Sequence, residues 1–150
     1  MVALIAALAA LALPSVASAL TLDASKCYTL SRDGNQYLDS TNSVLKIQQH
    51  DEDLSTGDDK GVRFHFPTLE NGWVVCEAHN DHFVGTGIPG TEWSTNDSEG
   101  STVALATVHV AGEKVYLNSG PRRFIGKDAE VATEEFDWDV KEINCLVNKS

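Results

Sequence analysis

Hydrophobic and polar positions alternate along most of the chain in short runs, without the spacing of helices. The runs are rich in β-branched and aromatic residues, as at 44–47, 103–110 and 136–140. Alternation with a period of two is typical of strands that bury one face. Gly, Asn, Asp and Pro lie between the runs and favour turns, because they accept positive φ or fix φ. The pattern predicts an all-β fold of about eleven or twelve short strands, either a barrel or a sandwich.

Three segments, 28–40, 74–86 and 115–127, repeat one pattern: an apolar strand, a polar turn, then an aromatic residue followed by an aliphatic one. The equivalent strand positions are Leu30, Cys76 and Leu117, separated in turn by 46 and 41 residues. The equivalent aromatic positions are Tyr37, Phe83 and Phe124. An apolar-polar-apolar triplet closes each unit, at 64–66, 108–110 and 136–138. The chain therefore contains three units of about forty residues, each predicted to hold four strands.

This arrangement resembles the β-trefoil, and the resemblance covers nearly all of residues 20–150. It is similar to the ricin-type lectin and fascin-like branches of that fold, in which a turn precedes an aromatic or Tyr-Leu pair. The resemblance implies a barrel with pseudo-threefold symmetry, whose inner layers are the aligned apolar positions. A two-sheet β-sandwich is the alternative fold.

The first nineteen residues form a separate segment. Residues 1–19 contain no charged side chain, and an apolar run precedes Pro14 and the small-residue sequence at 17–19. An apolar core before an A-x-A sequence is typical of a secretory signal peptide, with the terminal amine as its only positive charge here. Pro14 interrupts the run before it reaches the length of about 20 residues that a membrane anchor needs. We expect cleavage after Ala19 and a secreted, extracellular product; a buried N-terminal helix is the alternative.

Residues 20–150 have the length of one domain. They carry all 11 basic and 22 acidic side chains, which gives a net charge of −11. A field of that sign repels phosphate groups and anionic lipids, so neither nucleic acid nor a membrane is an expected partner. A glycan or an extracellular protein is expected instead, bound by a monomer.

Three cysteines, Cys27, Cys76 and Cys145, leave room for one disulfide in an oxidising compartment. Because the chain ends meet in a β-trefoil, the resemblance implies a Cys27–Cys145 bridge. Cys76 then occupies the same position as Leu30 and Leu117 and is expected to be a buried thiol. A Cys76–Cys145 bridge is the competing pairing.

Two polar clusters offer candidate chemistry. His79-Asn80-Asp81-His82 holds two histidines and a carboxylate that a metal would accept, but a polar turn at the repeat position explains it. The acidic segment 50–59 offers oxygen ligands for calcium without the pattern of a calcium loop, so we interpret it as a solvated insertion. Cys76 and His79 are also a candidate pair of nucleophile and base. The repeat places Cys76 in the core, however, where a thiol is not expected to react. No metal, cofactor or enzyme activity is predicted.

Ricin-type lectins place an Asp after an aromatic-Leu strand, then an aromatic platform, an Asn and a Gln-x-Trp motif. By resemblance, Asp39 after Tyr37-Leu38 matches the first element. The platform and the polar residues after it are matched only in repeat two, by Trp93, Asn96 and Asp97, and the Gln-x-Trp motif is absent. Aromatic faces stack on sugar rings and carboxylates accept from their hydroxyls, so these four residues are the predicted ligand site.

Lectin-like carbohydrate recognition without catalysis is the leading functional hypothesis. The alternative is a protein-directed β-trefoil, such as a protease inhibitor or a host-directed effector. It would act through the loop Thr86–Ser101, which is expected to expose Ile88 and Trp93. Asn96 also begins a glycosylation sequon, so a glycoprotein is expected, and a glycan there would compete with a sugar site around Trp93.

Overall fold

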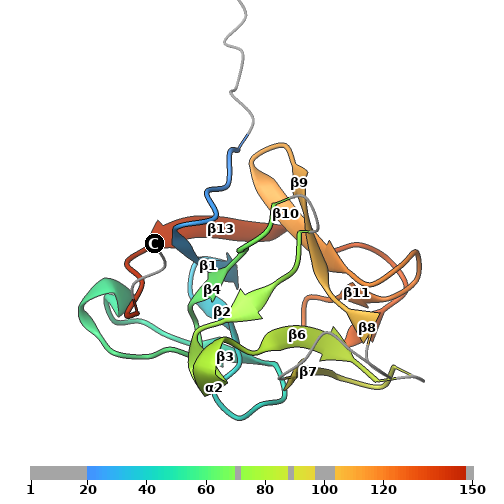
Figure 1. Ribbon diagram of the computed structural model, residues 1–150, viewed down its shortest axis with the longest axis horizontal. Helices are drawn as coiled ribbons and strands as arrows, with labels where there is room; N and C mark the ends of the chain where they lie inside the picture. Colours follow the sequence, from blue (N-terminus) through green and yellow to red (C-terminus); the bar gives the residue numbers. More distant parts are fainter. Residues whose placement is uncertain (1–19, 70–71, 88–89, 97–103, 148–150) are drawn as a thin grey trace, which may run out of the picture.

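Antiparallel strands make up the fold, which is all-β as the sequence predicts. The computed structural model describes residues 20–69, 72–87, 90–96 and 104–147, and Figure 1 shows their strands arranged around one core. Helical structure within these ranges consists of the one-turn helix α2 (Ala78–Asp81) and the 3-10 helix η1 (Leu54–Thr56). Neither is long and apolar enough to cross a membrane.

The described residues contain thirteen strands. In chain order they are β1 (Cys27–Arg32), β2 (Gln36–Asp39), β3 (Lys46–Gln49), β4 (Phe64–His65), β5 (Val75–Cys76), β6 (Phe83–Thr86), β7 (Trp93–Asn96), β8 (Ala104–Leu105), β9 (Thr107–Ala111), β10 (Lys114–Asn118), β11 (Phe124–Ile125), β12 (Val131–Ala132) and β13 (Trp138–Ile143). The sequence predicted fewer because the run 103–110 holds two strands, β8 and β9, and because β7 and the two-residue β12 were not predicted. In the other direction, two runs expected between 136 and 147 form the single strand β13.

The strands form one sheet in the order β12-β11-β10-β13-β1-β4-β5-β6-β7, with β2, β3, β8 and β9 paired to members of this path. The first and last strands lie side by side, joined by five residue pairs from Cys27↔Ile143 to Ser31↔Asp139. An isolated bridge between Trp73 and Thr107 connects the segment before β5 to β9. Three hairpins, β2–β3, β6–β7 and β11–β12, extend from these strands.

The repeated apolar positions form the core. Leu30, Cys76 and Leu117 have no exposed surface, and the same holds for the residues that follow the three aromatic positions, Leu38, Val84 and Ile125. At the first turn, Asp33 and Gly34 adopt positive φ (53° and 82°), as the turn composition predicts. The two-residue period thus identifies these six buried positions, although β1 is buried at four successive positions, Cys27 to Leu30.

The closing triplets are aligned differently from the prediction. Phe64 and Trp138 are fully buried, as is Ala106 between β8 and β9, whereas Val110 is 44% exposed. Strand pairing explains the difference, because Tyr28 pairs with Phe64 and the equivalent Val115 pairs with Trp138. The predicted alignment in the second and third units was therefore shifted by two residues.

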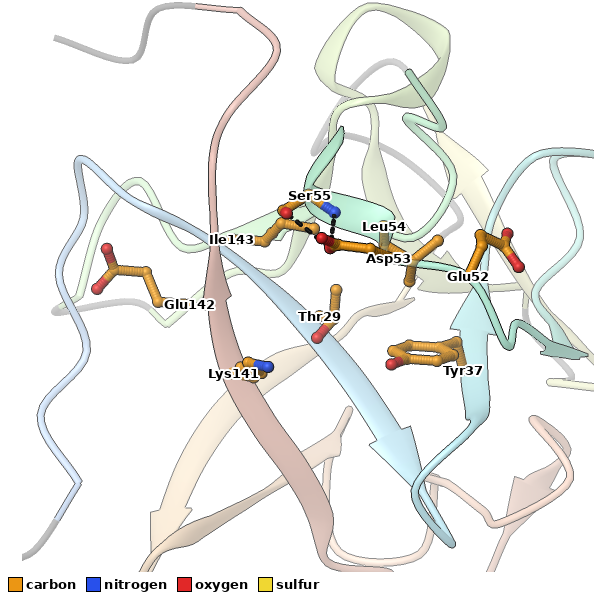
Figure 2. Close-up of a pocket in the computed structure, with 9 residues that line it drawn as sticks. All are labelled: Thr29, Tyr37, Glu52, Asp53, Leu54, Ser55, Lys141, Glu142 and Ile143. Atoms are coloured by element: carbon orange, nitrogen blue, oxygen red, sulfur yellow. Dashed lines mark hydrogen bonds between the residues drawn. The ribbon is translucent and has the colours of Figure 1, made fainter. Parts of the chain in front are cut away.

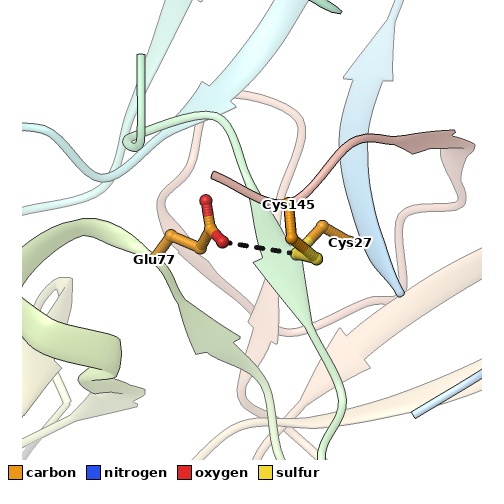
Figure 3. Close-up of side chains that lie close together, drawn as sticks. All are labelled: Cys27, Glu77 and Cys145. Carbon is orange, nitrogen blue, oxygen red and sulfur yellow. Dashed lines mark hydrogen bonds between the residues drawn. A yellow bond between two sulfur atoms is a disulfide. The ribbon is translucent and has the colours of Figure 1, made fainter. Parts of the chain in front are cut away.

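The two ends of the domain are joined covalently. Cys27 and Cys145 form a disulfide, and Cys76 is a free buried thiol, so the predicted bridge is confirmed and the Cys76–Cys145 alternative is wrong. Beside the bridge, the buried carboxylate of Glu77 accepts hydrogen bonds from the amides of Leu146 and Val147 at 3.1 and 3.2 Å. Figure 3 shows this carboxylate beside the disulfide. Glu77 thereby holds the C-terminal segment against the domain.

Arg63 is a charged side chain with no exposed surface. Its guanidinium donates to the carbonyl oxygens of Asn144 (2.9 Å), Asp59 (2.6 Å) and Leu54 (2.9 Å). Backbone carbonyl dipoles therefore satisfy a buried cation, which would otherwise be costly to desolvate. This contact attaches the acidic segment 50–59 to the C-terminal segment.

Loss of the disulfide should destabilise the fold markedly. The bridge spans 118 residues, and closing a loop of that size restricts the unfolded chain, which contributes about 2–5 kcal/mol. We expect the Cys27→Ala/Cys145→Ala double variant to lose that much free energy of unfolding in urea titrations. A double variant as stable as the parent would contradict this role.

Replacing Arg63 by Met should lower the free energy of unfolding by about 3 kcal/mol, because several buried carbonyls lose a charged donor. Arg122→Met is the matched control, since Arg122 is exposed, and its effect should stay within about 0.5 kcal/mol. Urea unfolding followed by tryptophan fluorescence measures both. Equal stability of the two variants would show that the Arg63 contacts contribute little.

Candidate functional site

A pocket of about 390 Å³ lies over β1, between β2 and β13. Figure 2 shows Tyr37, Lys141 and the segment of Glu52 to Ser55 around Thr29. The full lining is Thr29, Tyr37, Glu52, Asp53, Leu54, Ser55, Lys141, Glu142 and Ile143. An aromatic ring, a carboxylate, an amine and hydroxyls thus line one cavity, with Glu52 and Glu142 at its edge; the carboxylate of Glu142 points away from Thr29 (Figure 2) and pairs with Lys26 at 3.2 Å.

Strand pairing places the floor and two walls of this pocket. Thr29 on β1 pairs with Lys141 on β13, and Ser31 on β1 pairs with Tyr37 on β2. Thr29 is buried, while Tyr37 is half-buried and Lys141 exposed. The pocket therefore depends on the meeting of the first and last strands.

The third wall is the acidic segment 50–59. Leu54 is buried and Asp53 caps η1, accepting from the amide of Ser55 at 3.0 Å and from its hydroxyl at 2.6 Å. These hydrogen bonds lower the pKa of the Asp53 carboxyl. The segment was predicted to be a solvated insertion, and its acidic side chains are largely exposed. Its backbone, however, is held in place by Leu54 and Arg63.

His50 connects the acidic segment to Asp39. His50 Nδ1 lies 2.8 Å from Glu52 Oε1, and His50 Nε2 lies 3.3 Å from Asp39 Oδ2 and 3.7 Å from Asp59 Oδ2. Burial alone would lower the pKa of His50, but the hydrogen bonds to Glu52 and Asp39 outweigh it and raise the pKa above its usual value. The ring also makes an edge contact with Tyr37, with centroids 5.7 Å apart.

Asp39 lies where the lectin resemblance places it, but its carboxylate is almost fully buried. Oδ1 accepts from the amide of Thr41 at 2.8 Å and from its hydroxyl at 2.5 Å. It lines a smaller pocket of about 240 Å³ beside His50. Its role is thus to shape the end of β2, next to the larger pocket.

Trp93 is in the core instead of the predicted sugar site. The side chain has no exposed surface, and Nε1 donates to the carbonyls of Phe124 and Glu130 at 3.2 and 3.1 Å. The indole therefore connects β7 to the β11–β12 hairpin and offers no face to a ligand. The expectation that Trp93 is an exposed platform or loop contact was wrong, because its position on β7 turns it inward.

The other residues predicted in this region are placed only in part. Asn96 ends β7 and its side chain donates to the carbonyl of Ser94 at 3.2 Å. Asp97 and the rest of the sequon lie outside the described residues, as does Ile88 of the loop Thr86–Ser101. Within the part of the chain that the structure describes, Asp39 is therefore not joined to the predicted polar residues of repeat two.

The other residues considered as candidates in the sequence take part in contacts that hold the fold together. Residues 78–81 form α2, and Glu77 beside them binds the C-terminal amides. Glu77 also lies 3.6 Å from Cys27, but the sulfur atoms of Cys27 and Cys145 are bonded to each other and are not thiolate ligands. Cys76 is buried, and desolvation raises its pKa to about 11.

Comparison with protein-family models, curated proteins and solved structures gives no match for this chain. The pocket is therefore interpreted from its own residues. Sequence patterns did not point to Lys141, Glu142 or Thr29 as pocket residues, since the first two lie far from Tyr37 in the chain and Thr29 is part of the first apolar strand. The clue available in the sequence was the expected meeting of the chain ends, which brings β13 beside β1.

The Cys76 thiol should be unreactive in the folded protein. With a pKa of about 11, about one thiol in a thousand is ionised at pH 8, and burial blocks access to the sulfur. Ellman's reagent should label no thiol in native protein and one thiol per chain after unfolding in guanidinium. Rapid labelling of Cys76 without denaturant would contradict this and reopen a nucleophilic role.

Proposed function

We propose that the protein is a secreted, monomeric β-trefoil that binds carbohydrates without catalysis, through the pocket over β1. The signal-like residues 1–19 support secretion, and a disulfide is compatible with an extracellular location. The net charge of −11 argues against nucleic acid and anionic membranes as partners.

Strand pairing supports the β-trefoil interpretation. The pairs β1–β4, β4–β5, β9–β10, β10–β13 and β13–β1, with the Trp73–Thr107 bridge between the β5 segment and β9, describe a ring of six strands. Each pair of ring strands is accompanied by one hairpin. Equivalent buried residues recur in the three units, which agrees with threefold repetition of the sequence.

One observation carries the functional proposal: the ring of Tyr37 shares a 390 Å³ pocket with polar side chains on three sides. Sugar rings present apolar C–H faces that pack on aromatic rings, and hydroxyls that pair with carboxylates, amines and hydroxyls. Tyr37 supplies the ring that Trp93 was expected to supply. Asp53 supplies an acceptor and Lys141 supplies a donor, with Glu52 at the edge of the pocket.

The balance of charge in the pocket sets a preference among glycans. Three carboxylates and one ammonium line it, and Lys26 pairs with Glu142 at 3.2 Å. The remaining excess of one negative charge favours a cationic amino sugar over a sulfated sugar. This preference should weaken as salt is added, since exposed charges are screened within about 10 Å at 0.1 M salt.

A glycan array with neutral, amine-bearing and sulfated sugars tests the proposal. We expect binding to amine-bearing or neutral glycans, and Tyr37→Leu should weaken it about tenfold, equivalent to about 1.4 kcal/mol, because the aromatic face is lost. Lys141→Ala should also weaken binding, whereas Lys114→Ala, an exposed lysine on β10 paired with Asp139, is the matched control. Absence of any glycan binding, or wild-type affinity of Tyr37→Leu, would overturn the assignment.

A further inference from the structure

Next to the proposed carbohydrate site, Asp39 at the end of β2 and His50 and Asp59 at the two ends of the acidic segment 50–59 bring three donor atoms together. Asp39 ends β2, His50 follows β3, and Asp59 lies in the acidic segment 50–59. One ligand atom from each lies within 4.8 Å of the others. Asp39 is almost fully buried and His50 has a side chain that is 12% exposed, so this group is not a loose surface cluster.

We propose that His50 Nε2, Asp39 Oδ2 and Asp59 Oδ2 bind a divalent transition-metal ion of the Zn²⁺ type. Zinc binds nitrogen and oxygen at about 2.0–2.2 Å, which sets neighbouring donors of a tetrahedral site about 3.3–3.6 Å apart. The distances from Nε2 to the two carboxylate oxygens are 3.3 and 3.7 Å. A small movement of Asp59, the more exposed ligand, suffices to close the site on an ion.

The second polar atom of each of the three side chains, which would not bind the ion, is held by a hydrogen bond, as in known metal sites. Histidine ligands characteristically give their second ring nitrogen to a carboxylate, which orients the ring. Here Nδ1 of His50 lies 2.8 Å from Glu52 Oε1. The second oxygen of Asp39 is occupied by Thr41, and that of Asp59 accepts from the amide of Gly61 at 2.8 Å. Each ligand therefore keeps one atom for the ion.

Donor chemistry selects the metal. Calcium takes six to eight oxygen ligands, whereas this site offers two carboxylates and an imidazole, which suit zinc and its neighbours. A pocket of about 240 Å³, lined by Asp39, Thr41, Asn42, Val44, Lys46, Gln48 and His50, lies beside two of the three donors, so water can reach them. The metal site needs no glycan, so it goes beyond the proposed function.

Calorimetric titration of Zn²⁺ into the chelator-dialysed full protein tests the site. We expect one ion per chain, with affinity reduced at least tenfold in His50→Gln and Asp59→Asn. The side chain introduced by Asp59→Asn retains an oxygen for the Gly61 amide, so this variant should fold. His109→Gln and Asp58→Asn, both at exposed positions, are the matched controls and should bind as the parent does. Co²⁺ should give the visible absorption of a four-coordinate site that disappears in His50→Gln.

No Zn²⁺ binding, stronger binding of Ca²⁺ than of Zn²⁺, or unchanged affinity in His50→Gln and Asp59→Asn would each overturn the metal site. Thermal melts of the variants without metal show whether loss of binding reflects loss of folding; Asp59→Asn with parental stability and no binding supports the proposal. The titration contains no carbohydrate, and the glycan array can be run in chelator. Failure of one proposal is therefore distinguishable from failure of the other.

Discussion

The pairing of the first strand with the last is the constraint on which the other features of the protein depend. Five residue pairs join β1 to β13, and the Cys27–Cys145 disulfide closes the same junction covalently. Because Thr29 and Lys141 are opposite each other in this pairing, the floor and one wall of the large pocket exist only when the ends have met. The contacts are far apart in sequence, so they form only after most of the chain entropy is lost.

Two buried charged side chains reinforce that junction in complementary ways. Arg63 donates to carbonyl groups of the acidic segment and of Asn144, whereas Glu77 accepts from amides just beyond the disulfide. The amide of Glu77 in turn donates to the carbonyl of Arg63 at 3.0 Å. Buried charges are tolerated when hydrogen bonds fully satisfy them, and here the partners are backbone groups at the end of the chain. Through these hydrogen bonds, Arg63 and Glu77 hold the acidic segment and the C-terminal segment in fixed positions.

The excess of acidic residues acquires a more specific meaning in the folded protein. In the linear chain, 22 acidic residues suggest solubility and repulsion of anions. In the folded chain, Glu52, Asp53 and Glu142 line one pocket, with Glu142 paired to Lys26, while Asp39 and Asp59 approach His50 beside it. Glu52 belongs to both places, since it lines the pocket and contacts His50. A ligand in the pocket and an ion at His50 would consequently share a wall.

The sequence by itself determined the buried positions of the three repeated strands, because alternation along a strand is local: Leu30, Cys76 and Leu117 follow from it, as do the turn at Asp33-Gly34 and the all-β class. The Cys27–Cys145 bridge followed from the resemblance. Only the tertiary structure decided that Trp93 faces the core, that Arg63 is a buried anchor and that Lys141 faces the cavity of Tyr37. The reason is that the neighbours of a side chain across a sheet depend on the pairing register of strands that are far apart in sequence. A shift of two residues, as at Trp138, changes those neighbours and leaves the local pattern of hydrophobic and polar residues intact.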